Sequence, residues 1–218
     1  MAQNFVKGIM EIYLNENRLE ITTGDLSNFG QLIQKIERDF LEAGGEVLTQ
    51  IKLNDQLLDE ETEKDNSGLP LDRINVLHLY SATPAALILE ALEDAPVILS
   101  EMTVVIDEIL TAFENAEDSK GYQDFIIITD GLTWYMTIYS KAVVFFSNEI
   151  TRLKLQDDPF LTESQKLSKT IEDILNCQNS NDRTTFLDLL EYELKPTLGN
   201  LAARVTVFRE TLANEMSS

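Results

Sequence analysis

Few residues of this chain have side chains suited to catalysis. It contains one histidine, His78, and one cysteine, Cys177. A single histidine excludes a zinc site with paired histidines and the Glu-x-x-His pairs of a di-iron helical bundle. It also weakens any scheme in which a histidine activates a serine or cysteine nucleophile. The neighbours of Cys177 are Asn176 and Gln178, so no adjacent cation would activate its thiol.

Carboxylates remain as candidate metal ligands. Two segments that are predicted to be helical carry several acids each. These are Glu101, Asp107, Glu108 and Glu114 in one segment, and Asp188, Glu191 and Glu193 in the other. Acids at such spacing usually form a solvated helix face. We therefore expect no catalytic residue, no metal and no cofactor.

No sequence in the chain is typical of a phosphate-binding loop. Neither a Gly-x-Gly-x-x-Gly pattern nor a Walker loop is present. The pair Gly44-Gly45 is better explained as the end of a helix, because glycine accepts the left-handed conformation found there. Thr129-Asp130-Gly131 resembles only a fragment of a phosphate loop. The sequence therefore gives no support for a nucleotide-binding enzyme.

The composition is strongly acidic. The chain has 17 Lys and Arg against 38 Asp and Glu, a formal net charge of -21. Such a surface argues against binding to nucleic-acid phosphates or to an anionic membrane. The most apolar run, Phe125–Phe146, contains Asp130 and Lys141, so we expect no membrane span. A lone cysteine excludes an internal disulfide, and with no signal-peptide pattern at the start of the chain we expect a cytoplasmic protein.

The spacing of apolar residues in the first 82 residues predicts strands around one helix. Met10–Leu14 alternates with a period of two and predicts a strand. A turn at Asn15–Asn17 and a second strand with Leu19 and Ile21 follow. A helix is predicted from the apolar stripe Phe29, Ile33, Ile36 and Phe40, with Ser27 or Asp25 as its cap. Two later strands are expected, one with Thr49, Ile51 and Leu53 inward and one over Ile74–Tyr80 with Leu77 and Leu79 inward.

This order of elements resembles a ubiquitin-like module over about residues 10–80. The resemblance is carried by Gln50–Glu60 and by Leu71–Tyr80, which contains Leu-His-Leu. It implies a β-grasp fold and a role in protein binding. Conjugated members end in a free Gly-Gly tail, whereas Tyr80 continues into Ser81–Pro84, so we expect no conjugation. The loop Glu60–Leu71 is acidic and longer than the corresponding loop of ubiquitin, and we expect it to be a solvated excursion.

The outer face of this sheet is one candidate binding surface. Alternation places Tyr13, Lys52, His78 and Tyr80 on the face opposite the apolar core. Two aromatic rings and a histidine on an exposed sheet face would form an attractive protein-binding patch. The alternative is that the second domain packs on this face, because apolar sheet faces are usually covered.

From residue 83 onward the apolar spacing changes to about 3.6, which predicts helices. The expected domains are therefore residues 1–82, a ubiquitin-like β-grasp domain, and 83–218, an acidic antiparallel bundle of about four helices. The predicted helices are Pro84–Glu93, Pro96–Ala116, Tyr122–Leu155, a helix from Thr162 to Asn176, and one from Asp182 past Leu212. Turns are expected at Asp118–Gly121 and at Gln178–Asn181, and Pro196 should kink the last helix.

Tyr122–Leu155 is the second candidate binding surface. Its apolar residues fall on more than one face, as in a helix that several neighbours contact. Trp134 and Tyr135 are its proposed partner-binding residues. A strand at Phe125–Thr129 is the alternative for its first part, because three consecutive isoleucines favour β structure.

The sequence thus predicts a non-enzymatic interaction or scaffold protein. It would bind a protein partner or a second copy of itself, through the helical half and the outer sheet face. An export or flagellar-type chaperone for helical clients is the alternative, and an exposed apolar groove on the helices would favour it. A carboxylate-metal enzyme is a third, less favoured class.

Overall fold

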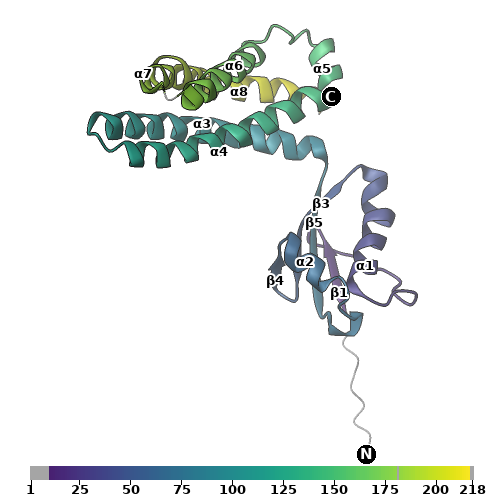
Figure 1. The fold of residues 1–218 in the computed structure, drawn as a ribbon. Helices are drawn as coiled ribbons and strands as arrows, with labels where there is room; N and C mark the ends of the chain where they lie inside the picture. Colours follow the sequence, from purple (N-terminus) through teal and green to yellow (C-terminus); the bar gives the residue numbers. More distant parts are fainter. Residues whose placement is uncertain (1–9, 181, 217–218) are drawn as a thin grey trace, which may run out of the picture. The chain divides into compact units, whose positions relative to one another are not determined.

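The computed structural model describes residues 10–180 and 182–216. The chain is a mixed α+β protein in which a five-stranded sheet is followed by a mostly helical C-terminal half (Figure 1). It divides into two compact units, Met1–Leu87 and Ile88–Ser218. We call them the sheet unit and the helical unit. No helix among the described residues is long and apolar enough to cross a membrane.

The sheet has the strand order β2-β1-β5-β3-β4. Its central strands β1 and β5 pair in parallel, and the other neighbours pair antiparallel. The strands are β1 (Glu11–Leu14), β2 (Asn17–Arg18), β3 (Val47–Leu53), β4 (Gln56–Leu58) and β5 (Val76–Ala82). The hairpin turns Asn15-Glu16 and Asn54-Asp55 have φ of 48°, 64°, 47° and 68°. Turns with two positive φ values match the right-handed twist of the strands that they join.

One face of the sheet packs on helix α1 (Phe29–Ile36). The predicted inward positions Leu77 and Leu79 are fully buried there. The core of this unit consists of Ile12, Phe29, Leu32, Ile33, Ile36, Ile51, Leu53, Ile74, Leu77 and Leu79. Thr49, predicted to point inward, is exposed because the pairing of β3 with β5 shifts register between Leu48 and Gln50. The second strand is also earlier and shorter than predicted, although Leu19 still donates a backbone hydrogen bond to Ile12.

Helix α1 continues into a π-helical turn, Glu37–Leu41, which changes the predicted apolar stripe. Each residue of a π turn is rotated relative to an α-helix, so the inward position moves along by one residue. Leu41 is therefore buried, whereas Phe40 is 39% exposed. The segment ends as predicted at the glycine pair, with Gly45 in the left-handed conformation at φ 65°.

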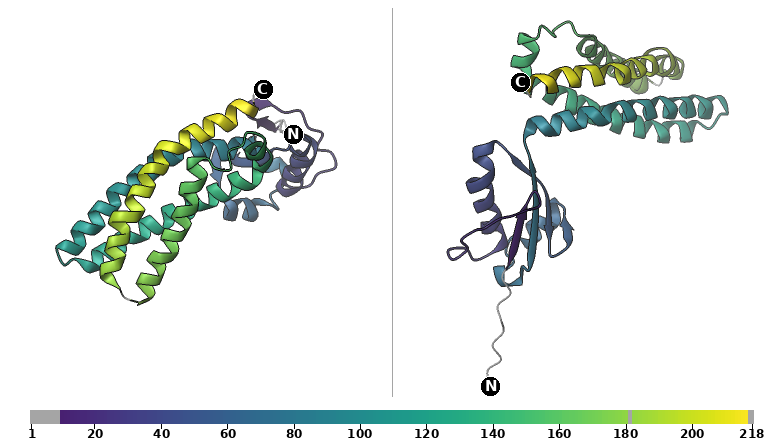
Figure 2. Two further views of the ribbon diagram at one scale, coloured as in Figure 1. Left: turned by 90° about the horizontal axis from the view of Figure 1, so that it is seen from above. Right: turned by 180° about the vertical axis from the view of Figure 1, so that it is seen from behind.

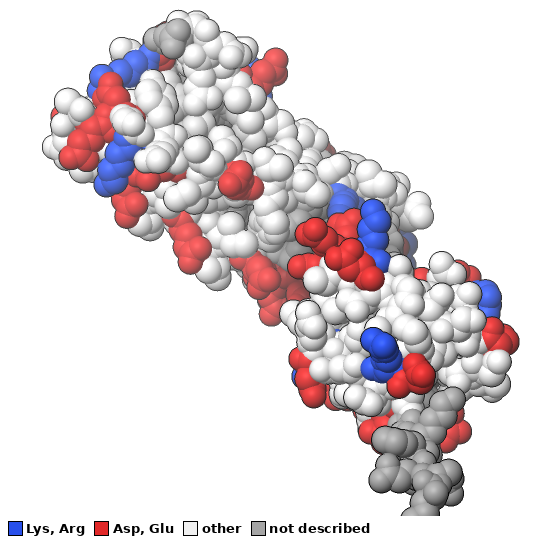
Figure 3. Space-filling view, turned by 60° about the horizontal axis from the view of Figure 1, so that its bottom comes forward, with Lys and Arg blue, Asp and Glu red and all other residues white. Residues whose placement is uncertain are grey.

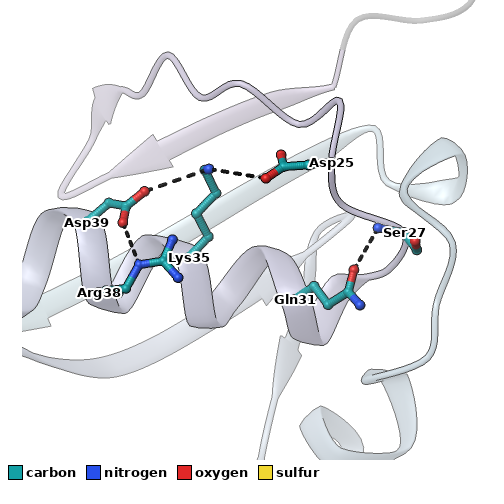
Figure 4. Close-up of polar contacts among 6 residues, drawn as sticks. All are labelled: Asp25, Ser27, Gln31, Lys35, Arg38 and Asp39. Atoms are coloured by element: carbon teal, nitrogen blue, oxygen red, sulfur yellow. Dashed lines mark hydrogen bonds and ion pairs between the residues drawn. The ribbon is translucent and has the colours of Figure 1, made fainter.

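The N-terminal cap of α1 is Asn28 and not Ser27 or Asp25 as predicted. The Asn28 side chain accepts a hydrogen bond from the Gln31 backbone N–H. Figure 4 shows the roles of the two predicted caps. The Ser27 backbone N–H donates to the Gln31 side chain at 2.8 Å, and Asp25 lies 3.9 Å from Lys35. Both residues thus support the first turns of the helix from outside it.

The predicted solvated loop after β4 contains a short helix, α2 (Glu60–Asn66). Asp59 caps it, and Asp59 and Thr62 exchange side-chain and backbone hydrogen bonds as a capping box. These bonds lower the pKa of Asp59. None of the side chains of α2 is buried, so the segment is solvated as predicted but is not irregular.

The helical unit consists of two pairs of long helices. Its helices are α3 (Pro84–Glu114), which begins in the sheet unit, α4 (Asp118–Phe145), α5 (Ser147–Arg152), α6 (Pro159–Ser180), α7 (Arg183–Asp188) and α8 (Lys195–Met216). Helices α3 and α4 lie side by side and run in opposite directions (Figures 1 and 2). Helix α6 packs against α7 and α8, and also against α4.

Helix α3 crosses Pro96 without a break, so the predicted division at this proline is wrong. A proline inside a helix removes one hydrogen bond and costs about 3 kcal/mol. The apolar residues around it are reason enough for the helix to continue, because Leu92, Ala95 and Leu99 are all fully buried. Tertiary packing of these residues outweighs the local preference.

The turn between α3 and α4 lies earlier than predicted. It is made by Ala116, at φ 58°, and α4 already begins at Asp118. The predicted break before α6 is present, but Asp158 begins that helix, because its side chain accepts from the Phe160 backbone N–H. Thr162, where this helix was predicted to begin, lies inside α6.

The last helical segment contains a π-helical turn, Leu189–Leu194, directly before Pro196. Asp182, where this helix was predicted to begin, is its N-terminal cap: its side chain accepts from the Thr185 backbone N–H, and the Thr185 side-chain and backbone bonds lower the pKa of Asp182. Pro196, where a kink is predicted, lies in the first turn of α8, two residues after this π turn.

Two helical glycines should respond oppositely to alanine. A Cβ at Gly121 would lie 2.6 Å from the buried ring of Phe113, whereas a Cβ at Gly199 would have nothing within 4 Å. We expect Gly121→Ala to lower the free energy of unfolding by about 1–3 kcal/mol. We expect Gly199→Ala to raise it by about 0.5–1 kcal/mol, because alanine favours the helix. Urea denaturation of both variants checks this, and a stabilised Gly121→Ala would contradict the close approach.

Candidate protein-binding surfaces

An open apolar groove of about 400 Å³ lies between α4 and α6. It is lined by Phe125, Thr129, Leu132, Thr133, Met136 and Thr137 of α4 and by Ile171, Ile174 and Leu175 of α6. Phe125, Leu132 and Ile174 are buried and form its floor. Thr133, Thr137 and Leu175 are exposed. The strand alternative for Phe125–Thr129 is wrong, since α4 is helical throughout this segment.

The α4 wall of the groove is a stripe of threonines whose hydroxyl protons are bonded within the helix. Thr129, Thr133 and Thr137 recur every four residues, and each hydroxyl donates at 2.8 Å to a carbonyl of its own helix. A threonine whose hydroxyl donates in this way has no free O–H donor to desolvate when a partner covers it. The wall therefore acts as a largely apolar surface despite its composition.

Tyr135 joins α4 to α6 in the core, so the structure does not place this predicted contact residue on a surface. It is fully buried, and its hydroxyl lies 2.7 Å from Ser164 Oγ. Burial raises the pKa of Tyr135 well above its usual range. No partner can reach the ring without separating the two helices. Trp134, its neighbour, is half-buried on α4.

Helix α4 also exposes more large apolar side chains than any other element of the described chain. Tyr122, Ile126, Ile127, Val144 and Phe145 are between 45% and 73% exposed. Scattered exposed apolar residues are normal on a protein surface. Their concentration on the helix that also forms one wall of the groove makes α4 the most apolar exposed element of the described chain, as in helices that contact a partner.

The outer sheet face carries the four residues predicted for it. Tyr13 pairs with His78 across β1 and β5, and His78 pairs with Lys52 across β5 and β3. The Tyr13 and His78 rings stack with centroids 4.8 Å apart and planes at 11°. These three side chains form one row across the central strands, and all are partly exposed. Tyr80 lies on the same face of β5.

The polar groups of this row already have partners. The Tyr80 hydroxyl donates to Glu16 at 2.5 Å, and the Glu16 carboxylate raises the pKa of Tyr80. The Lys52 ammonium lies 3.3 Å from Asp55. Carboxylates therefore hold Tyr80 and Lys52 beside the stacked rings of Tyr13 and His78, and the face is not a free cationic patch.

The acids considered as metal ligands are dispersed. Among residues 10–180 and 182–216, no three His, Cys, Asp or Glu side chains are placed to hold a metal ion. Asp107 and Glu193 instead pair with Lys195 and Lys166. Partial burial and two nearby carboxylates raise the pKa of Cys177, so its thiol is not activated.

The fold and the groove define a two-unit α+β protein whose helical unit carries an open apolar groove. A family model described as "Domain of unknown function (DUF8042)" matches residues 90–203, just over half of the chain. The chain belongs to this family. The matched span includes both helices that line the groove. No curated protein and no solved structure matches the chain.

The sequence missed the α6 side of the groove. Ile171, Ile174 and Leu175 were expected only as part of a helix in the bundle. One sequence signal could have found Leu175. The core stripe of α6, which includes Phe160 and Leu167, is complete without it, so this large apolar side chain is left exposed. The groove itself depends on how two helices that are not consecutive in the chain pack against each other, and local periodicity does not report that.

Proposed function

We propose that this chain is a non-enzymatic interaction protein that binds a segment of a partner protein in the α4–α6 groove. The observation that carries the proposal is the groove itself, with a buried apolar floor and a wall of threonines whose hydroxyl protons are bonded within the helix. Grooves between helices bind amphipathic helices, which bury one apolar face in them. Among the described residues no cluster of metal-binding side chains offers a competing chemical role.

We also propose a fold type for each of the two units. We propose that the sheet unit is a β-grasp domain, supported by the parallel central pair β1 and β5 and by the helix that crosses one sheet face. We propose that the helical unit is an antiparallel four-helix bundle formed by α3, α4, α6 and the α7–α8 segment. The opposite directions of α3 and α4 support this (Figures 1 and 2).

The row Tyr13–His78–Lys52 with Tyr80 is the second proposed contact surface. Stacked aromatic rings supply contact area at a low cost in side-chain entropy, and such residues are enriched at protein interfaces. In this proposal the chain is a cytoplasmic adaptor, with one surface on each unit.

An export or flagellar-type chaperone is the second candidate function. The open groove and the exposed apolar residues of α4 favour it. Both functions use the same groove, and they differ in the client. A chaperone would hold several unrelated helical segments, whereas an adaptor would hold one partner at fixed stoichiometry.

Blocking the groove tests the proposed function. We expect Thr133→Arg to remove a stoichiometric partner that co-purifies with the tagged wild-type protein from its native cells, because a long charged side chain would fill the groove. The matched control is Thr151→Arg on α5, an exposed threonine whose hydroxyl also bonds within its own helix. Mass spectrometry and circular dichroism give partner yield and fold.

Three other outcomes would contradict or change the proposed function. If Thr133→Arg is folded and retains the partner at the wild-type ratio, the groove is not the binding site. If Tyr13→Ala with Tyr80→Ala releases the partner instead, the outer sheet face carries the interaction. If several helical clients are lost together with Thr133→Arg, the chaperone reading replaces the adaptor reading.

A further inference from the structure

The helical turns that line the groove carry acidic side chains and no basic ones. Residues 121–140 of α4 contain Asp124 and Asp130 and no Lys or Arg. Residues 170–180 of α6 contain Glu172 and Asp173 and again no Lys or Arg. Asp130 follows the lining residue Thr129 and Glu172 follows the lining residue Ile171, each about 100° further around its helix, so these two acids flank the groove, whereas Asp124 and Asp173 lie on the far sides of their helices. The groove is thus apolar at its floor and has one exposed acid at the edge of each helix.

These four acids are not neutralised within the chain. Among the described residues none of them forms an ion pair with Lys or Arg, and Asp130 and Glu172 are exposed. Acids elsewhere on the same unit do have partners, such as Asp107 with Lys195 and Asp118 with Arg183. Figure 3 shows the general surplus, in that acidic side chains outnumber basic ones on the face it displays.

We infer that the groove takes a basic amphipathic helix. The occupant presents an apolar stripe to Phe125, Leu132 and Ile174 and places Lys or Arg along its edges, opposite the acids of both walls. This inference rests on the proposed function and names the chemistry of its partner. From Phe125 to Thr137 the groove is about 18 Å long at the rise of an α-helix, so it accommodates about three turns.

Charge decides among the occupants that could fill an apolar groove. A second copy of this chain would bring another net charge of -21 against the first. Like charges brought together at an interface are unfavourable, and complementary charge accelerates and orients association. A purely aliphatic ligand would gain nothing from Asp130 and Glu172. A basic helix satisfies both the apolar floor and the two flanking acids.

Three synthetic peptides of about 18 residues, enough for five turns, test the inference. The first has a leucine stripe at helical spacing and lysines elsewhere. The second keeps the stripe and replaces lysine with glutamate, and the third has the composition of the first in scrambled order. We expect the first to bind the full-length protein at least tenfold more tightly than the other two, as measured by fluorescence anisotropy of labelled peptide.

Variants locate the binding and separate its two components. We expect Thr133→Arg and, independently, Thr137→Arg to weaken the first peptide at least tenfold, and Thr151→Arg to leave its affinity unchanged. Asp130→Asn combined with Glu172→Gln should weaken the lysine peptide severalfold. The same pair should not weaken a peptide with glutamine in place of lysine, because that peptide has no charge to lose.

Each of the other outcomes contradicts a specific part of the inference. Equal binding of the lysine and glutamate peptides, sensitive to Thr133→Arg, overturns the basic partner and leaves the helix-binding function in place. Equal binding of the scrambled peptide shows attraction to the acidic surface only. Binding of lauric acid that Thr133→Arg abolishes, with no peptide bound, makes the groove a lipid site. If no peptide binds although Thr133→Arg still loses the cellular partner, the occupant is not a basic helix, while the groove remains functional.

Discussion

Replacing Phe160 with alanine is expected to lower the free energy of unfolding of the helical unit by about 3–5 kcal/mol. Phe160 lies in the first turn of α6 and is fully buried. Its ring stacks on Phe208 of α8 with centroids 4.4 Å apart, and its other side meets Tyr139 of α4. Alanine would leave a cavity where three helices meet, and the surrounding helices can close it only in part.

The single tryptophan makes this loss measurable in one unit. Trp134 belongs to α4, so its fluorescence during urea denaturation follows the helical unit separately from the sheet unit. Phe145→Ala is the matched control, since that ring is 47% exposed, and we expect a loss of about 1 kcal/mol or less. Equal losses in the two variants would mean that Phe160 is not at the junction of the helices.

Removing the Tyr135 hydroxyl is expected to destabilise the helical unit by about 1–2 kcal/mol at neutral pH. Ser164 donates its hydroxyl proton to the Phe160 carbonyl at 2.8 Å, so Tyr135 must be the donor in its 2.7 Å bond with Ser164. Tyr135→Phe leaves one lone pair of Ser164 Oγ buried without a partner, and that loss is not compensated by water.

The same hydroxyl should make stability depend on alkaline pH. Burial raises the pKa of Tyr135 above its ordinary value of 10.0, with a smaller opposing effect of the Ser164 bond. Below about pH 10 both the folded and the unfolded states hold the proton. As the pH rises further, the unfolded state loses its proton first, so the free energy of unfolding falls. Tyr135→Phe should remove most of this fall.

Urea denaturation at about pH 9, 10 and 11 measures it, with the window set by the tyrosine pKa. Tyr139, whose pKa burial also raises, leaves a shallower dependence in the variant. Tyr139→Phe is therefore the control, and it should retain the larger part of the fall. An unchanged slope in Tyr135→Phe would show that another group titrates.

The sequence predicted the elements better than their ends. Alternation placed Leu77 and Leu79 in the sheet core, and the glycine pair marked where the α1 segment ends. The sequence did not predict that Leu41, and not Phe40, is the buried residue, because a π turn has no local sequence signal. Helix α3 was divided at Pro96 because local preference was weighed without the packing that opposes it.

The candidate binding surfaces were also predicted only in part. The outer row Tyr13, His78 and Lys52 follows directly from the period of two and the strand order, and the structure brings these residues together. Tyr135 was expected to contact a partner because α4 is apolar on several faces, but helical spacing alone does not tell which face meets α6. The groove requires the packing of both helices, and only the structure supplies it.

The two outermost strands of the sheet bear on how this protein behaves at high concentration. Strand β2 has two residues and β4 has three, and these are the edges at which another chain could add a strand. Long, flat edges act as templates for sheet growth between molecules, whereas very short edges offer too few free backbone groups to do so. The sheet is therefore protected against edge-to-edge polymerisation, and concentrated solutions should stay free of amyloid-type fibres.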